Sequence, residues 1–195
     1  FSNLAALINY SATFAIAFLL SLYLQYIKSY NAAEAGTILA IQPVLMAIFS
    51  PFTGRLSDKI APQILASIGM GLIAVGLFAM IFIDTDTSMT FIVANLILFG
   101  IGYALFSSPN TNAIMSSVER KHYGIASGMV GTMRLVGQIS SIALATMIFQ
   151  LYLGNQTVVP ENYPEFVSSV KTDFVIFAIL CLVGVFFSLA RGKQK

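Results

Sequence analysis

Six long apolar runs constrain the fold of this chain more than any other feature of its sequence. An α-helix rises about 1.5 Å per residue, so a run of about 17 to 25 apolar residues can cross a hydrocarbon layer about 30 Å thick. The runs predict transmembrane helices at residues 4–27, 35–52, 63–83, 89–115, 124–153 and 174–190. The composition agrees, because 57% of the residues are hydrophobic and 9% are charged, whereas about 25% are charged in a soluble domain. We therefore expect an all-α integral membrane protein.

The few charged, sulfur and imidazole groups exclude several classes of function. The net charge of +2 is small and the basic residues are dispersed, which argues against nucleic-acid binding. The lone Cys181 excludes an internal disulfide and the lone His122 excludes any familiar metal cluster, so we expect no metal and no cofactor. An intramembrane enzyme is not expected either, because the hydroxyl groups in the spans have no neighbouring base.

Basic residues between the spans predict the orientation in the cell membrane. Those on one side and in the tail are Arg55, Lys59, Arg120, Lys121, Arg191, Lys193 and Lys195, whereas Lys28 and Lys171 lie on the other side. This is seven against two, with Arg134 set aside. The positive-inside rule therefore places both termini of the segment in the cytoplasm and arranges the spans as three hairpins.

The connections and chain ends carry shorter signals. Asn31 and Glu34 have the spacing of a capping box that opens the second span, and Pro43 and Pro51 predict bends in it. Residues 84–87 form an acidic turn, and residues 154–173 are predicted to be the longest loop. The chain opens with Phe1 inside an apolar segment, without a start methionine or a basic leader, which indicates a fragment.

Arg134 is a positive charge in the middle of the fifth span. It lies ten residues after Gly124, which is about 15 Å along a helix and close to the centre of the hydrocarbon layer. Because contact with acyl chains would cost at least a few kcal/mol, we expect its face of the helix to meet an aqueous cavity or a polar partner. The alternative is that Arg134 snorkels or is neutralised by carbonyl groups of a neighbouring helix. Steps of three or four residues place on this face Ser127, Gly131, Arg134, Gln138, Ser141 and Ala145.

Polar residues are unevenly shared among the six spans. The first, second, fourth and fifth carry them, whereas the third and sixth are nearly bare, so the pattern repeats after three helices. It predicts two inverted three-helix repeats with the third helix of each on the lipid side. The alternative is six unrelated helices of accidental polarity. Asn9 and Thr13 share a face of the first span, and Tyr103 and Asn110 lie in the fourth, whose polar second half is expected to line an aqueous space. In the fifth, Gly131 follows Gly124 and Gly128 and leaves room for a close second helix.

The connection after the second span carries the most specific motif. Residues 54–62, GRLSDKIAP, resemble the G-x-L-a-D-r-x-G-r signature of the major facilitator superfamily, with matches at Gly54, Leu56, Asp58 and Lys59. Gly54 leaves room at a tight helix crossing, and Asp58 can cap a helix start or pair with a nearby basic group. Residues 99–102 (FGIG), 108–110 (SPN) and 124–128 (GIASG), followed by Arg134, further resemble the C-terminal half of fourteen-helix drug:proton antiporters.

This resemblance implies a role for the chain as the C-terminal six-helix half of a transporter. In that family two halves rock about a substrate site near the midplane of the membrane. The first and fourth helices of each half line the cavity, the second and fifth meet the other half, and the third and sixth are scaffold. Cavity roles are thus implied for Asn9, Thr13, Tyr103, Asn110 and Gln138. Gating or interface roles are implied for Arg134, Gly131, Gly54, Asp58 and Lys59, with Arg134 holding a carbonyl-rich or acidic partner.

The function implied is proton-coupled efflux of hydrophobic or cationic drugs. Besides a small-molecule substrate and the lipid bilayer, the expected partner is an N-terminal half that is missing here, or else a second copy of the chain. Proton coupling needs a carboxylate or histidine within the membrane, and the predicted spans contain none. Either coupling lies in the missing half, as the resemblance implies, or the protein does not couple to protons. A carrier of a small metabolite and a channel or non-transporting membrane subunit stay open as alternatives.

Overall fold

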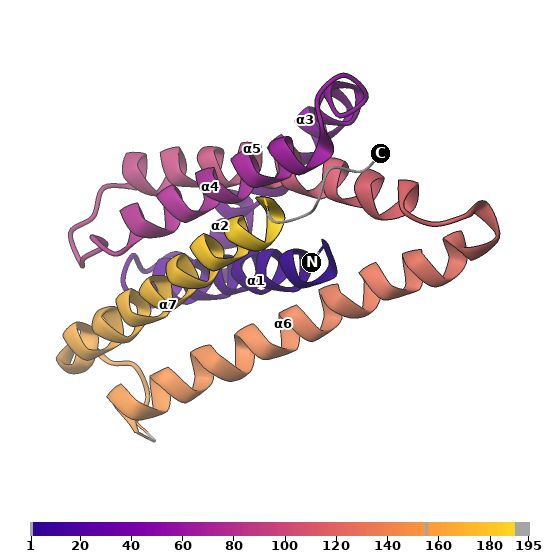
Figure 1. The fold of residues 1–195 in the computed structure, drawn as a ribbon. Coiled ribbons are helices and arrows are strands. Elements are labelled where there is room, and N and C mark those ends of the chain that lie inside the picture. Colours follow the sequence, from indigo (N-terminus) through magenta and orange to yellow (C-terminus); the bar gives the residue numbers. More distant parts are fainter. Residues whose placement is uncertain (1, 155, 190–195) are drawn as a thin grey trace.

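The computed structural model describes residues 2–154 and 156–189, which fold into helices and connections with no strand among them (Figure 1). Six segments within them are long and apolar enough to cross a membrane, which confirms the predicted all-α class and number of spans. Phe1, the predicted span end at residue 190 and the basic residues of the tail lie outside the described residues. The helices are α1 (Ser2–Tyr26), α2 (Ala32–Leu39), α3 (Ile41–Leu56), α4 (Pro62–Met80), α5 (Met89–Ser116), α6 (Tyr123–Leu153) and α7 (Tyr163–Leu189), with 3₁₀ turns η1 (Arg120–His122) and η2 (Pro160–Asn162).

The second span consists of two helices, α2 and α3. The predicted capping box opens α2, because the N–H of Glu34 donates to Asn31 Oδ1 and the N–H of Asn31 donates to Glu34 Oε2, each over 2.9 Å. The span is interrupted at Ala40, just before Pro43, which has no N–H to donate to the preceding turn. This interruption agrees with the bend expected near Pro43. α3 then continues through Pro51 to Leu56, beyond the predicted end at residue 52.

α7 begins earlier than predicted, because the expected loop at residues 154–173 is helical from Tyr163 onwards. Pro164 is compatible with a helix here since it lies in the first turn, where the N–H groups have no intrahelical acceptor. Ser168 and Thr172 each donate a hydrogen bond to the carbonyl four residues earlier, so their hydroxyl groups are satisfied on the helix. The predicted boundary at Phe174 was wrong because it marked the first uninterrupted apolar residue and not the start of the helix.

The six spans form two interlocked sets of three, α1–α4 and α5–α7. The first helix of each set packs on the middle span of the other, because α1 lies along α6 and α5 lies along α3. The last helices of the sets, α4 and α7, pack on each other, and α4 also packs on α5 as α7 does on α1. Such a reciprocal exchange of partners is what two inverted repeats produce, so the predicted repeat is confirmed.

α4 is held by a close backbone approach on one side and a polar link on the other. A Cβ atom on Gly69 would lie 2.6 Å from the carbonyl oxygen of Gly102 in α5, so these two helices touch backbone to backbone. Towards α7, the hydroxyl groups of Ser67 and Ser188 are buried and 2.8 Å apart. Of the α4 spanning window 56% is buried inside the bundle, so the prediction that this span lies on the lipid side concerns only its other face and stays a prediction. Its one exposed face carries Ile64, Ile68, Val75 and Phe78.

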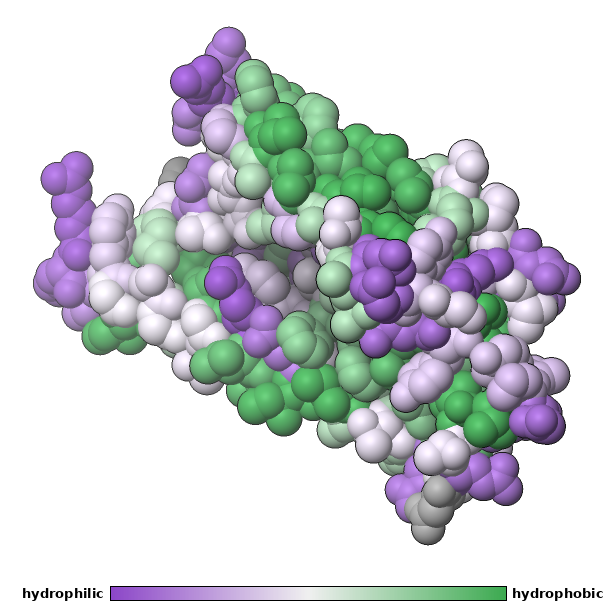
Figure 2. Space-filling view, turned by 180° about the vertical axis from the view of Figure 1, so that it is seen from behind, coloured by the Kyte–Doolittle hydropathy of each residue, from purple (hydrophilic) through white to green (hydrophobic). Residues whose placement is uncertain are grey.

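α3 and α6 are the least covered spans. Within the chain 22% of the α6 window and 11% of the window that contains α3 are buried, against 61% for α1. The two helices lie on opposite sides of the bundle (Figure 1). The face seen in Figure 2 carries large apolar areas, with polar residues at both ends and a few between the apolar areas. Exposed helices in so apolar a chain require lipid or another bundle as their surroundings.

Candidate substrate path and gating residues

Three of the predicted cavity residues are buried inside the bundle. Asn9 on α1 and Tyr103 and Asn110 on α5 are 1%, 2% and 1% exposed. Asn9 Nδ2, Tyr103 Oη and Asn110 Oδ1 form no hydrogen bond with the described part of the chain. Each buried polar atom without a partner costs about 1–3 kcal/mol. A water molecule or a polar group of a ligand would remove that cost, but the cavity role of these residues stays a prediction.

The other two predicted cavity residues, Thr13 and Gln138, are half-buried. The Thr13 hydroxyl donates to the carbonyl oxygen of Asn9 over 2.8 Å, so it is tied to its own helix. The carbonyl oxygen of Gln138 accepts a hydrogen bond of 2.8 Å from the Ser141 hydroxyl. Both residues therefore lie between the bundle interior and its surface.

Arg134 contacts α1 through Tyr10. Its Nη2 atom lies 3.4 Å from the Tyr10 hydroxyl oxygen, and its guanidinium carbon lies 4.9 Å from the centre of the Tyr10 ring. The contact combines a long hydrogen bond with a cation–π interaction. Tyr10 is buried, whereas Arg134 lies on the exposed part of α6, and no described carboxylate forms an ion pair with it. Its partner within the chain is thus an aromatic ring, and its remaining donors are available to a group outside the chain.

The polar stripe predicted on α6 divides between two environments. Ser141 is buried, whereas Gly131 is exposed and no described atom lies within 4 Å of the position of its Cβ. α1 and α6 are in close contact at Gly137, where a Cβ would lie 2.8 Å from the carbonyl oxygen of Leu7. There the Ser11 hydroxyl donates to the carbonyl oxygen of Gly137 over 3.0 Å. The interface role of Gly131 stays a prediction that concerns another bundle.

The connection that carries the signature motif, residues 54–62, contacts the C-terminal part of α5. A Cβ atom on Gly54 would lie 3.0 Å from Ser108 Oγ, in agreement with the tight crossing expected at this glycine. The Ser57 hydroxyl donates to the carbonyl oxygen of Gly54 over 2.6 Å and accepts a hydrogen bond of 2.8 Å from Asn112 Nδ2. Ser57 and Asn112, which the sequence motif did not single out, therefore position the turn that carries Asp58.

Asp58 and Lys59 are exposed at this end of the bundle. The prediction that Asp58 caps α4 is wrong, because the residue before that helix is Ala61 and no side chain caps it. Among the described residues Asp58 forms no ion pair with Lys59 or Arg55. Asp58 instead lines an open groove of about 350 Å³. A carboxylate in such a groove can bind a basic side chain of another segment, and the gating role of Asp58 and Lys59 stays a prediction.

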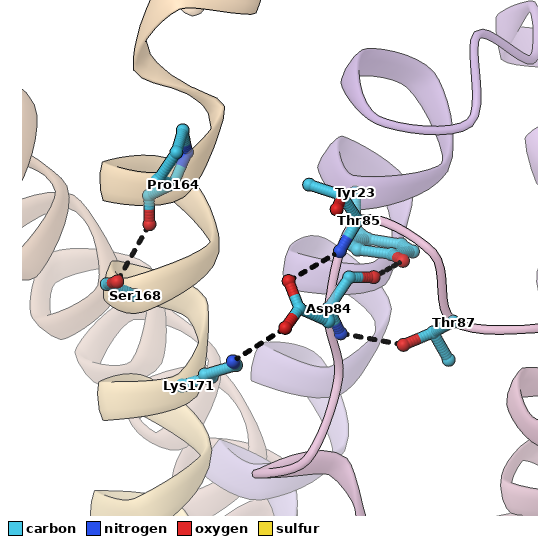
Figure 3. Close-up of polar contacts among 7 residues, drawn as sticks. All are labelled: Tyr23, Asp84, Thr85, Thr87, Pro164, Ser168 and Lys171. Carbon is cyan, nitrogen blue, oxygen red and sulfur yellow. Dashed lines mark hydrogen bonds and ion pairs between the residues drawn. The ribbon is translucent and has the colours of Figure 1, made fainter.

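A polar cluster around Asp84 closes the opposite end of the bundle, which we call the Asp84 end (Figure 3). Asp84 lies in the turn between α4 and α5, and its carbonyl oxygen accepts a hydrogen bond from the Tyr23 hydroxyl of α1. Its Oδ2 atom lies 3.7 Å from Lys171 Nζ of α7, and its N–H donates to the Thr87 hydroxyl over 2.6 Å. An exposed ion pair of this kind contributes about 0–1 kcal/mol, so the contact between α7 and the turn can open at small cost.

Asp173 is a carboxylate inside a span, contrary to the prediction that the six spans contain none. It lies in α7 and is 0% exposed. Neither of its carboxylate oxygens forms a hydrogen bond with the residues that the structure describes. The prediction failed because it assigned this residue to a loop. Helical spacing was the signal that could have revealed it, because Asp173 continues the buried stripe formed by Phe166, Val170, Phe177 and Cys181.

Several known bacterial proteins are similar to this chain in sequence. The chain is 33% identical over 138 residues to the uncharacterized transporter YebQ of Escherichia coli, and the match covers 71% of this chain and 30% of that protein. It is 25% identical over 200 residues to the riboflavin transporter RibZ of Clostridioides difficile (98% and 43%). It is 30% identical over 184 residues to the lincomycin resistance protein LmrB of Listeria monocytogenes (91% and 39%). The chain therefore spans less than half the length of each of these relatives.

The family match agrees with the interlocked repeats of the fold. Residues 3–195 match the family model described as Major Facilitator Superfamily, which is nearly the whole chain. Proteins of this family are transporters and not enzymes, and six apolar spans make this chain a multi-pass membrane protein. The chain belongs to the Major Facilitator Superfamily.

Proposed function

We propose that this chain is the C-terminal half of a carrier that exports hydrophobic or cationic drugs by alternating access. The observation that carries the proposal is the exposure of α3 and α6, of whose spanning windows only 11% and 22% are buried within the chain. In an alternating-access carrier these are the helices that meet a companion bundle. The N-terminal half of the same protein is the companion we propose, and a second copy of this chain is the alternative.

The likeness to a lincomycin resistance protein over 91% of the chain supports a drug as the substrate. The chemistry of the three buried polar residues is compatible with such a substrate. Tyr103 offers a ring, and Asn9 and Asn110 offer amides, which suit a hydrophobic cation better than a fixed positive charge would. Arg134 would repel a cation, so we assign it to a gate. In one state of the carrier Arg134 contacts Tyr10, and in the other state it contacts a group of the other half.

A carrier of a small metabolite is the second candidate. The likeness to a riboflavin transporter extends over 98% of the chain, at 25% identity. A flat, polar aromatic metabolite could use the same ring and amide groups as a drug. The two candidates share the half-transporter architecture and differ only in the compound carried.

Accumulation measurements with the complete protein distinguish the candidates. The protein would be produced in bacteria that lack their own major exporters, with the empty vector as control. A drug exporter lowers the cellular level of a fluorescent cationic dye and of lincomycin, and collapse of the proton gradient abolishes the effect. A change in riboflavin level without a change in dye level would favour the metabolite carrier. Unchanged levels of all three compounds would contradict both candidates.

A further inference from the structure

Asp173 is a buried carboxylate that is not part of the proposed substrate path. Its side chain is fully buried in a bundle in which α7 packs on α1, α4 and α6. It is 0% exposed, and within the described chain neither oxygen has a hydrogen-bond partner. The burial comes from packing between helices of this half, so neither lipid nor a companion bundle is needed to produce it. The side chains buried near it on α7 include the apolar Phe166, Val170, Phe174 and Phe177. The one buried hydroxyl a turn earlier, that of Ser169, donates to the carbonyl oxygen of Phe166 over 2.6 Å.

Among the described residues of the packed elements, no charged group forms an ion pair with Asp173. Lys171, the nearest basic residue along α7, is directed to Asp84 instead, as Figure 3 shows, with 3.7 Å between Nζ and Oδ2. α4 contains no titratable side chain. η2 contributes only Glu161, which is exposed, and the other acid of α7, Glu165, is exposed as well.

The tyrosines of the neighbouring helices are engaged elsewhere. Tyr152 of α6 shares a hydrogen bond of 2.9 Å with Thr172. Tyr23 of α1 donates to the carbonyl oxygen of Asp84, and Tyr26 packs its ring edge against Phe166. Further along the same helices, Arg134 and Tyr10 contact each other. An ionised carboxylate buried without a cation or donor is strongly unfavourable, whereas a neutral carboxylic acid is tolerated.

We propose that Asp173 is a proton-binding site, occupied while α7 is packed as described here and emptied when the Asp84 end opens to water. The step is a simple proton exchange, in which the carboxylate takes up a proton from water and forms an O–H bond, and the reverse step returns the proton to water. The contacts of Asp84 with Tyr23 and Lys171 hold that end closed, and Lys171 lies two residues from the acid. Use of this proton to drive efflux rests on the proposed function, but the site itself does not.

Infrared spectroscopy of the complete protein tests the site directly. At neutral pH the wild-type protein should show the carbonyl stretching band of a buried, protonated carboxylic acid. Asp173→Asn should lose this band, and Glu165→Gln, which removes an exposed acid from the same helix, should keep it. A wild-type spectrum without the band, or a band that survives in Asp173→Asn, would overturn the proposal.

Thermal unfolding provides a second readout that needs no substrate. The packed state holds a proton that the unfolded chain releases at neutral pH, so the wild-type midpoint should fall as the pH rises. Asp173→Asn should flatten this dependence while Glu165→Gln retains it, and an unchanged slope in Asp173→Asn would contradict the site. Asp173→Leu serves as a second neutral variant. Failure of both neutral variants to fold would also contradict the proposal, because a site for a neutral acid accepts neutral side chains.

Dye transport in proteoliposomes separates the site from its use. If the proton drives efflux, Asp173→Asn should lose dye transport driven by a pH gradient, whereas Glu165→Gln keeps it. Gradient-driven transport that persists in Asp173→Asn would refute the coupling. Absence of dye transport by the wild-type protein would instead refute the proposed drug substrate, and the infrared and unfolding results would stand independently of it.

Discussion

Among the described residues Arg134 has one weak partner, Tyr10, and it is exposed on α6. Its contact with the Tyr10 ring, 4.9 Å from the guanidinium carbon, is worth about 0.5–1 kcal/mol at an exposed site. An interaction of that size can be exchanged for a stronger one, such as an ion pair with a group of a companion bundle, without a large barrier. A residue that selects between two partners in this way fits a gate better than a structural anchor.

The gate role predicts a separation of transport from stability. Arg134→Ala should lower dye efflux by the complete protein about fivefold or more, the scale of a coupling free energy of about 1 kcal/mol. The free energy of unfolding should fall by less than about 1 kcal/mol, because only an exposed contact is lost. Arg120→Ala, which removes an exposed arginine at the bundle end, is the control and should change neither quantity. Unchanged efflux in Arg134→Ala would remove the proposed role.

At the scale of the element, two glycines of α4 predict opposite effects of the same substitution. A Cβ on Gly69 would meet the Gly102 carbonyl oxygen at 2.6 Å, whereas no neighbouring atom of the described chain lies within 4 Å of a Cβ on Gly71. Gly69→Ala should push α4 from α5 and lower the free energy of unfolding by about 1–3 kcal/mol. Gly71→Ala should raise it by up to about 1 kcal/mol, because alanine favours the helix.

Thermal unfolding midpoints of the two glycine variants of the complete protein, in the same detergent, check this prediction. Equal midpoints, or a more stable Gly69→Ala, would show that α4 and α5 are not in backbone contact there.

The elements differ in how far their structure follows from sequence alone. The capping box of Asn31 and Glu34 is local, and the six spans and their repeat follow from polarity, so these predictions are confirmed. The close contact of α6 at Gly137 could not be predicted, because it depends on which helix crosses α6 and where. Asp173 was missed for a third reason: charged residues near a helix end mimic a loop until helical periodicity is followed through them.

For the whole molecule, the two ends of the bundle should lie on opposite sides of the membrane. The positive-inside rule places the exposed Lys59 in the cytoplasm and the exposed Asp86, near the Asp84 end, outside. In a cysteine-free background of the complete protein, Asp86→Cys should react with a membrane-impermeant thiol reagent in intact cells. Lys59→Cys should react only after the cells are made permeable. The reverse pattern would overturn the proposed orientation.

The crossed packing of the repeats also bears on how the protein is made. α1 (Ser2–Tyr26) packs extensively against α6 (Tyr123–Leu153), which leaves the ribosome much later. At a synthesis rate of about 10 residues per second, the delay is on the order of ten seconds. During that interval the Ser11 hydroxyl of α1 lacks its acceptor on α6, the carbonyl oxygen of Gly137. We therefore expect nascent α1 to stay within the membrane-insertion machinery until α6 has been made.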